Sequence, residues 1–146
     1  MHDVATTAKP SGKRWLISGK KRWVQNGHGA NHIVLSARTS GSGRDPNGLS
    51  LFVIDPGMAG LKVERVDMMD GQKGAMLSLE NVEVDESRLL GAPGSAAPLL
   101  DHLMDYGAAA AVCEASGILQ AVLWMTRGYL MERKQFGVAI GTFQAL

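Results

Sequence analysis

The residues best suited to chemistry stand near the end of the chain, where a helical run is expected to stop in Glu132-Arg133-Lys134. Arg133 presents a planar guanidinium, which suits a bidentate contact with a phosphate or a carboxylate. Gly137 follows in the break Gln135-Phe136-Gly137 and permits a positive φ just past the helix. Thr142 is suited to cap a second helix that begins near it. The segment predicts an anion-binding joint between two helices.

The other residue types that often do chemistry show no functional spacing. Cys113 lies among alanines in a helical run and is expected to be a small buried side chain rather than a nucleophile. Asp101 and Asp105 stand one helical turn apart, which a solvated helix face explains without acid–base chemistry. The histidines lack the mutual spacing of a metal site, so we predict no metal centre. They are His2, His28, His32 and His102.

The composition sets broad limits on function. The chain has 146 residues, the size of one domain or two small ones. Its 15 basic and 14 acidic side chains give a formal net charge of +1, which provides no general attraction for nucleic acid or an anionic membrane. A single cysteine cannot form an internal disulfide, and the first residues lack the apolar core of a signal peptide. We therefore expect a cytoplasmic protein.

The elements that must position these residues begin with short apolar runs typical of β-strands. Ser18-Gly19 between the first two runs predicts a tight turn, and the glycine-rich stretch 40–48 predicts a connecting loop. No helical run separates the strands, which indicates an antiparallel barrel or sandwich. The predicted strands are 14–18, 21–25, 33–39, 49–54, 61–66, 76–80 and 82–84.

The pattern changes at Gly91-Ala-Pro-Gly-Ser95, and one long helix is predicted from about 96 to 133. Its apolar stripe cannot be buried by one helix alone, so partners from further sequence or another subunit are expected. The run 106–125 has the length of a membrane span, but its central Glu114 favours a helix buried in a soluble protein. We therefore predict no membrane span. The stripe contains Leu99, Leu103, Tyr106, Ala110, Cys113, Gly117 and Gln120.

Several motifs, in the same order along the chain, resemble the acyl-CoA dehydrogenase family. The stretch 15–27 is similar to the family pattern Gly-x-Lys-x-Trp-Ile-Thr-Asn-Gly, and 31–38 is similar to its next strand. The segment 91–95 resembles the lead into its long helix, and 133–137 with Phe143-Gln144 resembles its Arg-Lys-x-Phe-Gly and Phe-Gln signals. The resemblance runs from about residue 3 to 146.

The resemblance implies an α+β protein. An antiparallel β-barrel or sandwich domain would be followed by a long helix of an incomplete up-and-down helical bundle. Residues 1–92 would form the middle β domain without its first strand, and residues 93–146 would begin the C-terminal helical domain. The chain would thus be an internal fragment of a dehydrogenase.

The resemblance also implies FAD as the cofactor and an acyl-CoA thioester as the substrate. Position by position, Trp23, Val24 and Gln25 would line the flavin ring, although the family usually has Thr or Ser where Gln25 stands. The segment Arg133, Lys134 and Gln135 would hold the pyrophosphate and adenosine of the FAD of a neighbouring subunit. Phe136, Phe143 and Gln144 would lie in the same cofactor region, and Asp105 would lie on the substrate side.

The same resemblance leaves the chain without a catalytic residue. The family's catalytic Glu usually lies on a later helix, beyond Leu146. In some members it lies on the long helix near the position of Gly107, which cannot act as a base. The resemblance further implies a homotetramer built as a dimer of dimers, with an electron-transferring flavoprotein as electron acceptor. Two alternatives stay open: a related flavin oxidase or monooxygenase, and a non-catalytic flavin-binding or assembly module.

Overall fold

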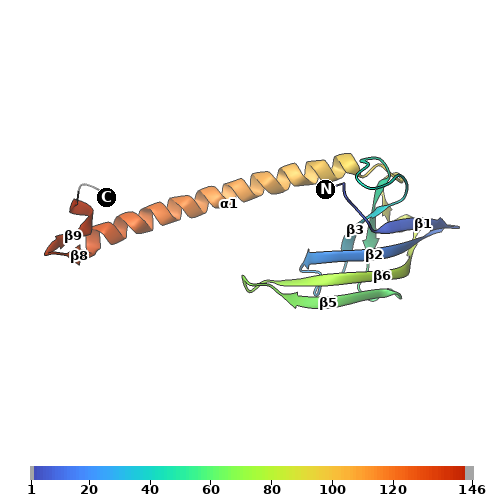
Figure 1. Cartoon of the computed structure of the whole chain (residues 1–146), viewed down its shortest axis with the longest axis horizontal. Helices are drawn as coiled ribbons and strands as arrows, with labels where there is room; N and C mark the ends of the chain where they lie inside the picture. The colour runs from blue at the N-terminus through green and yellow to red at the C-terminus, as the bar shows by residue number, and fades with distance from the viewer. Residues whose placement is uncertain (1, 144–146) are drawn as a thin grey trace. The chain divides into compact units, whose positions relative to one another are not determined.

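The computed structural model describes residues 2–143, and the chain divides into two compact units between Asp101 and His102. Figure 1 shows the strands of the first unit and the helical segment of the second. The first unit contains β1 (Thr7–Ser11), β2 (Arg14–Gln25), β3 (Ile33–Arg38), β4 (Leu49–Ile54), β5 (Leu61–Asp67), β6 (Lys73–Asp85), the short 3₁₀-helix η1 (Glu86–Arg88) and β7 (Leu89–Leu90). Helix α1 (Ala97–Glu132) begins in it, and β8 (Lys134–Gln135), β9 (Val138–Ala139) and η2 (Ile140–Thr142) follow.

The seven strands of the first unit form one sheet in the order β5-β6-β2-β1-β3-β4-β7. Neighbouring strands are antiparallel except β1 and β3, which are joined in parallel at Thr7 and Arg38. No helix interrupts residues 12–85. The predicted α+β fold, a β domain followed by one long helix, is therefore confirmed. The domain boundary near residue 92 stays a prediction.

The sheet curls so that strands from both of its halves share one core. Ile17 of β2, Leu35 of β3, Phe52 of β4 and Leu77 of β6 are almost completely buried in the same cluster. Trp15 packs edge-on against Phe52, with ring centroids 5.7 Å apart. Burial of each such side chain contributes about 1.5–3 kcal/mol, so this cluster is the main stabilising feature of the unit.

The predicted tight turn at Ser18-Gly19 is wrong, because β2 runs through it without reversing. The turn lies earlier, at Gly12-Lys13 between β1 and β2, and Gly12 has a φ of 61°. At Gly19 the pairing of β2 with β6 shifts register. A β-carbon there would lie 2.7 Å from the Cα atom of Thr6, so the glycine allows the N-terminal segment to approach closely. A glycine inside a strand thus marks close backbone approach rather than a turn.

The other predicted strands agree with the structure to within a few residues, apart from the last two runs and the unpredicted short strands β1 and β7. The two runs predicted at 76–80 and 82–84 form one strand, β6, which continues through a bulge at Asn81 with a φ of 51°. Hydrogen bonds between Ser18 and Asn81, at 3.0 Å and 3.1 Å, hold this bulge. The strand β1 was not predicted, because Lys9-Pro10-Ser11 lacks an apolar alternation.

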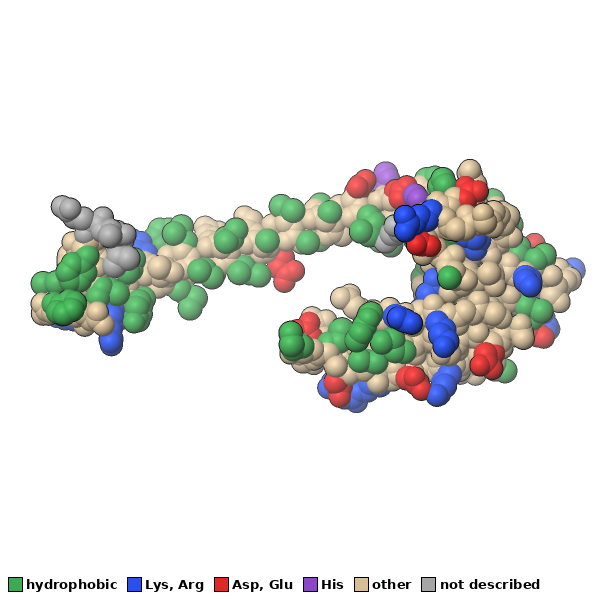
Figure 2. Space-filling view, viewed as in Figure 1, with side chains coloured by type: hydrophobic (Ala, Val, Ile, Leu, Met, Phe, Trp, Pro, Cys, Tyr) green, Lys and Arg blue, Asp and Glu red, His purple; other side chains and the backbone are tan. Residues whose placement is uncertain are grey.

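Helix α1 spans 36 residues, close to the predicted range, and nearly all of it is exposed. Its only buried residues within the described part of the chain are Ala97 and Leu100. The visible face in Figure 2 carries apolar side chains along the helix. By length and composition α1 could cross a membrane, because an 18-residue window has a mean hydropathy of 1.5. Packing of this helix inside a protein stays a prediction.

Candidate functional site

The segment Trp23-Val24-Gln25 lies at the end of β2, beside a β-bulge. Lys21 pairs with Leu77 and Val24 pairs with Ala75, so two residues of β2 face one residue of β6. Trp23 has a φ of 57° and its side chain is 59% exposed. Gln25 is exposed as well, whereas Val24 is half-buried against the core.

A positive φ is rare for a bulky side chain and costs on the order of 1–3 kcal/mol. Bulges commonly re-aim a side chain, and strained residues persist where the surrounding structure fixes them. Here the bulge turns a large aromatic face toward solvent instead of into the sheet. The structure therefore holds the indole exposed at the cost of a strained backbone.

Lys21 lies next to this bulge and was given no role by the sequence analysis. Its Nζ donates a hydrogen bond to the Ser36 Oγ of β3 at 3.0 Å. Burial lowers the pKa of Lys21 to about 8. The signal that pointed to it was its place as the Lys of the Gly-x-Lys-x-Trp pattern, where the Trp alone was assigned a contact.

The second group of predicted residues follows α1. The helix ends at Glu132, as expected, and the predicted break at 135–137 is a tight hairpin: Lys134 pairs with Ala139 and Gln135 pairs with Val138. Phe136 and Gly137 form the turn with φ values of 52° and 85°. The predicted positive φ at Gly137 is confirmed, but the glycine serves a hairpin and not a helix C-cap, because two successive positive φ angles reverse the chain.

Arg133 is anchored by its backbone while its side chain is exposed. Its N–H donates to the Tyr129 carbonyl at 2.9 Å, and its own carbonyl accepts from the Ile140 N–H at 2.8 Å. Among the described residues its guanidinium has no carboxylate partner within ion-pair distance. A fixed backbone with an available guanidinium is suited to an anionic ligand.

The second helix expected from near Thr142 lies mostly outside the described residues, which end at Phe143. Thr142 lies in η2 and its hydroxyl donates to the Ala139 carbonyl at 2.7 Å, so it does not cap a helix there. Phe143 packs edge-on against Phe136, with centroids 6.4 Å apart. Gln144, also predicted to lie near the cofactor, falls outside the described residues. Phe136 itself is 93% exposed.

Asp105 lies on the exposed surface of α1, near His102 and Tyr106. The rings of His102 and Tyr106 stack edge-on at 5.8 Å. Gly107 follows on the same helix, and a β-carbon there would meet nothing within 4 Å. The predicted residues thus form two groups, 23–25 on the β unit and 105 with 133–143 on the helical unit.

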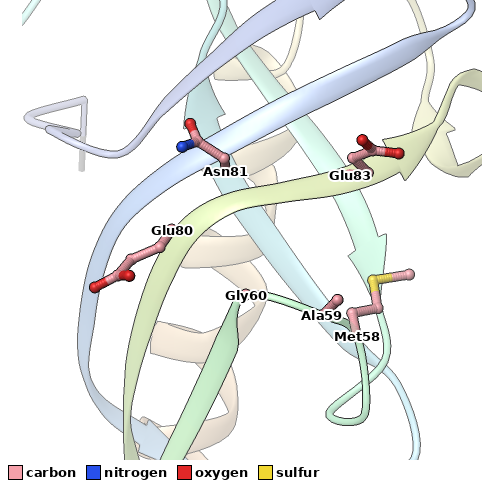
Figure 3. Close-up of a pocket in the computed structure, with 6 residues that line it drawn as sticks. All are labelled: Met58, Ala59, Gly60, Glu80, Asn81 and Glu83. Atoms are coloured by element: carbon pink, nitrogen blue, oxygen red, sulfur yellow. The ribbon is translucent and has the colours of Figure 1, made fainter.

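A separate pocket of about 350 Å³ lies on the β unit and contains none of the predicted residues. Met58, Ala59 and Gly60 line it from the loop before β5, and Glu80, Asn81 and Glu83 line it from β6 (Figure 3). Glu83 pairs with Arg14. Two carboxylates make the pocket a poor site for a phosphate-bearing cofactor, because like charges repel.

The exposed residues fit the chemistry of a flavin nucleotide. The flat indole of Trp23 can pack against a planar ring system, and the Gln25 amide can donate a hydrogen bond beside it. Arg133 and Lys134 offer positive charge to phosphate groups. Among the described residues no group of three or more metal-binding side chains occurs.

Comparison with known proteins identifies the family. The profile described as acyl-CoA dehydrogenase, middle domain, matches residues 1–82. The chain belongs to the acyl-CoA dehydrogenase family. Glutaryl-CoA dehydrogenase from Desulfococcus multivorans is 32% identical over 144 residues, which cover 97% of this chain and 37% of that protein. The chain therefore spans little more than a third of the length of this relative.

Solved structures extend the likeness to the whole chain. The FAD complex of PigA matches with a TM-score of 0.90 and 26% identity, covering 99% of this chain and 38% of the other. The prolyl acyl carrier protein oxidase AnaB matches with a TM-score of 0.89 and 29% identity, covering 99% and 39%. The order of motifs in the sequence had pointed to the same family. The individual contacts assigned to residues 23–25, 105 and 133–144 stay predictions.

Proposed function

We propose that this chain forms part of the flavin-binding surface of an FAD-dependent enzyme that oxidises the α,β bond of acyl-CoA thioesters. The observation that carries the proposal is Trp23, whose strained backbone holds an indole exposed beside Gln25 in a member of this family. The cofactor, when bound, supplies the acceptor for the hydride. The residues of this chain would bind and orient it.

The helical unit would contribute charge to the same function. Arg133 and Lys134, with Gln135, Phe136, Phe143 and Gln144, would contact the phosphate and adenosine part of FAD in a neighbouring subunit. Asp105 would lie toward the substrate. This arrangement requires a homo-oligomer, proposed as a dimer of dimers. The exposed apolar side chains of α1 support it, because such a surface favours association. We propose an electron-transferring flavoprotein as acceptor and the cytoplasm as location.

No residue of the described chain is proposed as the catalytic base. Gly107 stands where some family members carry the base on the long helix, and a hydrogen side chain cannot take a proton. A positioned general base commonly contributes 10²–10⁴-fold, so the 146-residue chain alone is expected to show little or no dehydrogenation even with FAD supplied. A dye-coupled assay with several acyl-CoA substrates tests this. Turnover that disappears in Asp105→Asn would contradict it.

The flavin assignment is tested by FAD binding to the chain and its variants. Trp23→Ala should weaken binding by about 0.5–1.5 kcal/mol, the typical contribution of an aromatic stack. Trp124→Ala is the matched control, because Trp124 is exposed to a similar degree on α1. Fluorescence titration with FAD gives the affinities. Equal affinities for the two variants would remove Trp23 from the flavin site.

The phosphate contact is tested separately at Arg133. Arg133→Lys keeps the charge but loses the bidentate fork. The binding free energy of FAD should therefore weaken by about 1–3 kcal/mol, and less FAD should be retained. Arg127→Lys, six residues earlier on α1, is the control, because Arg127 stacks on the Trp124 ring at 5.6 Å instead. Unchanged FAD content after gel filtration of Arg133→Lys would exclude the assignment.

A flavin oxidase is the second candidate, and the likeness to the oxidase AnaB favours it. Both functions would use the same exposed Trp23 and Gln25, and they differ in the electron acceptor. Oxygen consumption and dye reduction, measured side by side on the same preparation with an acyl thioester, separate the two. A non-catalytic flavin-binding or assembly module would bind FAD and support neither reaction.

A further inference from the structure

The sheet of the β unit is open between the end of β2 and the start of β3. Residues 14–18 of β2 pair with β1, but residues 19–25 pair only with β6 among the described strands. On the other side, β3 pairs with β4 along its length and meets β1 only at Arg38. The two strand ends therefore leave a gap that no backbone ladder closes.

A cavity of about 150 Å³ lies in this gap, and Lys21 extends into it. Val24, Leu35 and Leu77 give it apolar walls, and Ser36 provides the hydroxyl that accepts the hydrogen bond from Lys21. Arg22 is the other charged residue of the lining, and among the described residues no carboxylate from β2, β3 or β6 lines it. A lysine in such a place is unusual, because its ammonium has been partly desolvated without a counter-ion.

We propose that Lys21 is a nucleophilic amine and a site of covalent acylation by acyl thioesters. The choice of an acyl thioester as donor rests on the proposed function, whereas the site rests on the cavity, the absence of a lining carboxylate and the Ser36 contact. The step uses the neutral amine. Its nitrogen lone pair attacks the thioester carbonyl, the C–N bond forms, the C–S bond breaks and coenzyme A leaves as a thiolate, while the amine proton passes to solvent.

Two properties of the site favour the reaction. Burial lowers the pKa of Lys21 to about 8, so about a quarter of the amine is neutral at pH 7.5, far more than for an ordinary lysine. The product also suits its surroundings better than the reactant does. An amide carries no charge to desolvate, its N–H can keep the hydrogen bond to Ser36, and its acyl carbons can occupy the apolar part of the cavity.

The neighbouring Lys20 provides a matched control within the same strand. Lys20 is exposed, does not line the cavity and has Glu64 as a nearby charge. The full chain is incubated with acetyl-CoA at pH 7.5, and acetylation of each lysine is followed by peptide mass spectrometry. We expect Lys21 to react about tenfold faster than Lys20, because the Lys21 amine is partly neutral and lines the cavity that takes up the acyl group. The Lys21 rate should rise with pH and level off above about pH 8.

Either of two results would overturn the proposal: Lys20 reacting as fast as Lys21, or a Lys21 rate that rises throughout the same pH range. These comparisons use the wild-type chain and so do not depend on the folding of a variant. Lys21→Arg should remove the fast phase of total acetylation, and Lys20→Arg should leave it in place. FAD binding is measured on the same preparation, so loss of the flavin function would be seen independently of acylation.

Discussion

Phe52 in β4 is fully buried, whereas Leu119 in α1 is 70% exposed, although both are large apolar side chains in regular secondary structure. The same contrast holds for the glycines. Gly48 in the β unit is packed against the backbone of Ser40, while Gly107 in α1 has open space around it. Most large apolar side chains of the β-strands are buried inside the β unit. The helix carries large apolar side chains that remain exposed within the described chain.

The difference in packing between the two units is tested most directly by removing one large side chain from each unit. Phe52→Ala should lower the free energy of unfolding by about 3–5 kcal/mol, because it leaves a cavity beside Trp15. Leu119→Ala should change it by less than about 0.5 kcal/mol, the usual range for an exposed position. Urea denaturation followed by circular dichroism measures both. A large loss for Leu119→Ala would show that α1 is packed against a partner in solution.

Substituting alanine for Gly48 and for Gly107 should change the stability of the protein in opposite directions. At Gly48, with a φ of 90°, the new β-carbon would lie 2.1 Å from the Ser40 carbonyl oxygen, so we expect a loss of about 2–3 kcal/mol. At Gly107, alanine should stabilise the helix by about 0.5–1 kcal/mol, because it lowers the entropy cost of helix formation. Thermal unfolding of each variant and gel filtration test the pair. If Gly107→Ala stabilised the helix but impaired self-association, a partner helix would have to approach closely at Gly107.

The sequence predicted most of the fold because each β-strand pairs and packs with strands of the same unit. The run 61–66 alternates apolar and charged residues, and the run 49–54 is almost continuously buried, so both can be recognised from the local sequence. The turn at Ser18-Gly19 failed for a tertiary reason: Gly19 is required by the approach of Thr6, which no short-range pattern records. The hairpin at Phe136-Gly137 was mistaken for a helix cap because both structures place a positive φ just after a helix.

The candidate site was less accessible to sequence reasoning than the fold. Trp23 and Gln25 could be located from the motif, but the bulge that exposes the indole depends on how β2 pairs with β6. Lys21 belongs to the same motif, but the motif does not reveal that its side chain is buried. Its cavity exists because β1 is too short to fill the gap between β2 and β3, which is a property of sheet topology. The roles proposed for residues 105 and 133–143 involve a neighbouring subunit, so they stay predictions.

The two units also differ in their ion pairs, and this difference leads to the prediction with the smallest effect on stability. In the described chain every ion pair lies within residues 2–101, including Asp55, which contacts the His32 Nδ1 and the Arg88 Nη1 at 2.7 Å each. The hydrogen bond from His32, and then that from Arg88, lowers the pKa of Asp55 below its ordinary value. A lowered pKa in the folded state means that the stabilisation is complete above the unfolded pKa of about 3.9 and is lost as the pH falls through the folded pKa.

Asp55→Asn should therefore lose less stability than the wild type when the pH is lowered from 5 to 3, and the difference should be modest because the carboxylate is partly exposed. Urea midpoints at the two pH values measure it. Glu114→Gln on α1 is the control and should not reproduce the effect of Asp55→Asn, because Glu114 has no ion-pair partner among the described residues. If Glu114→Gln instead reduced the acid sensitivity, the carboxylate would have to be paired with a group from another chain. The helix would then resemble the β unit, with its contacts made in an assembly.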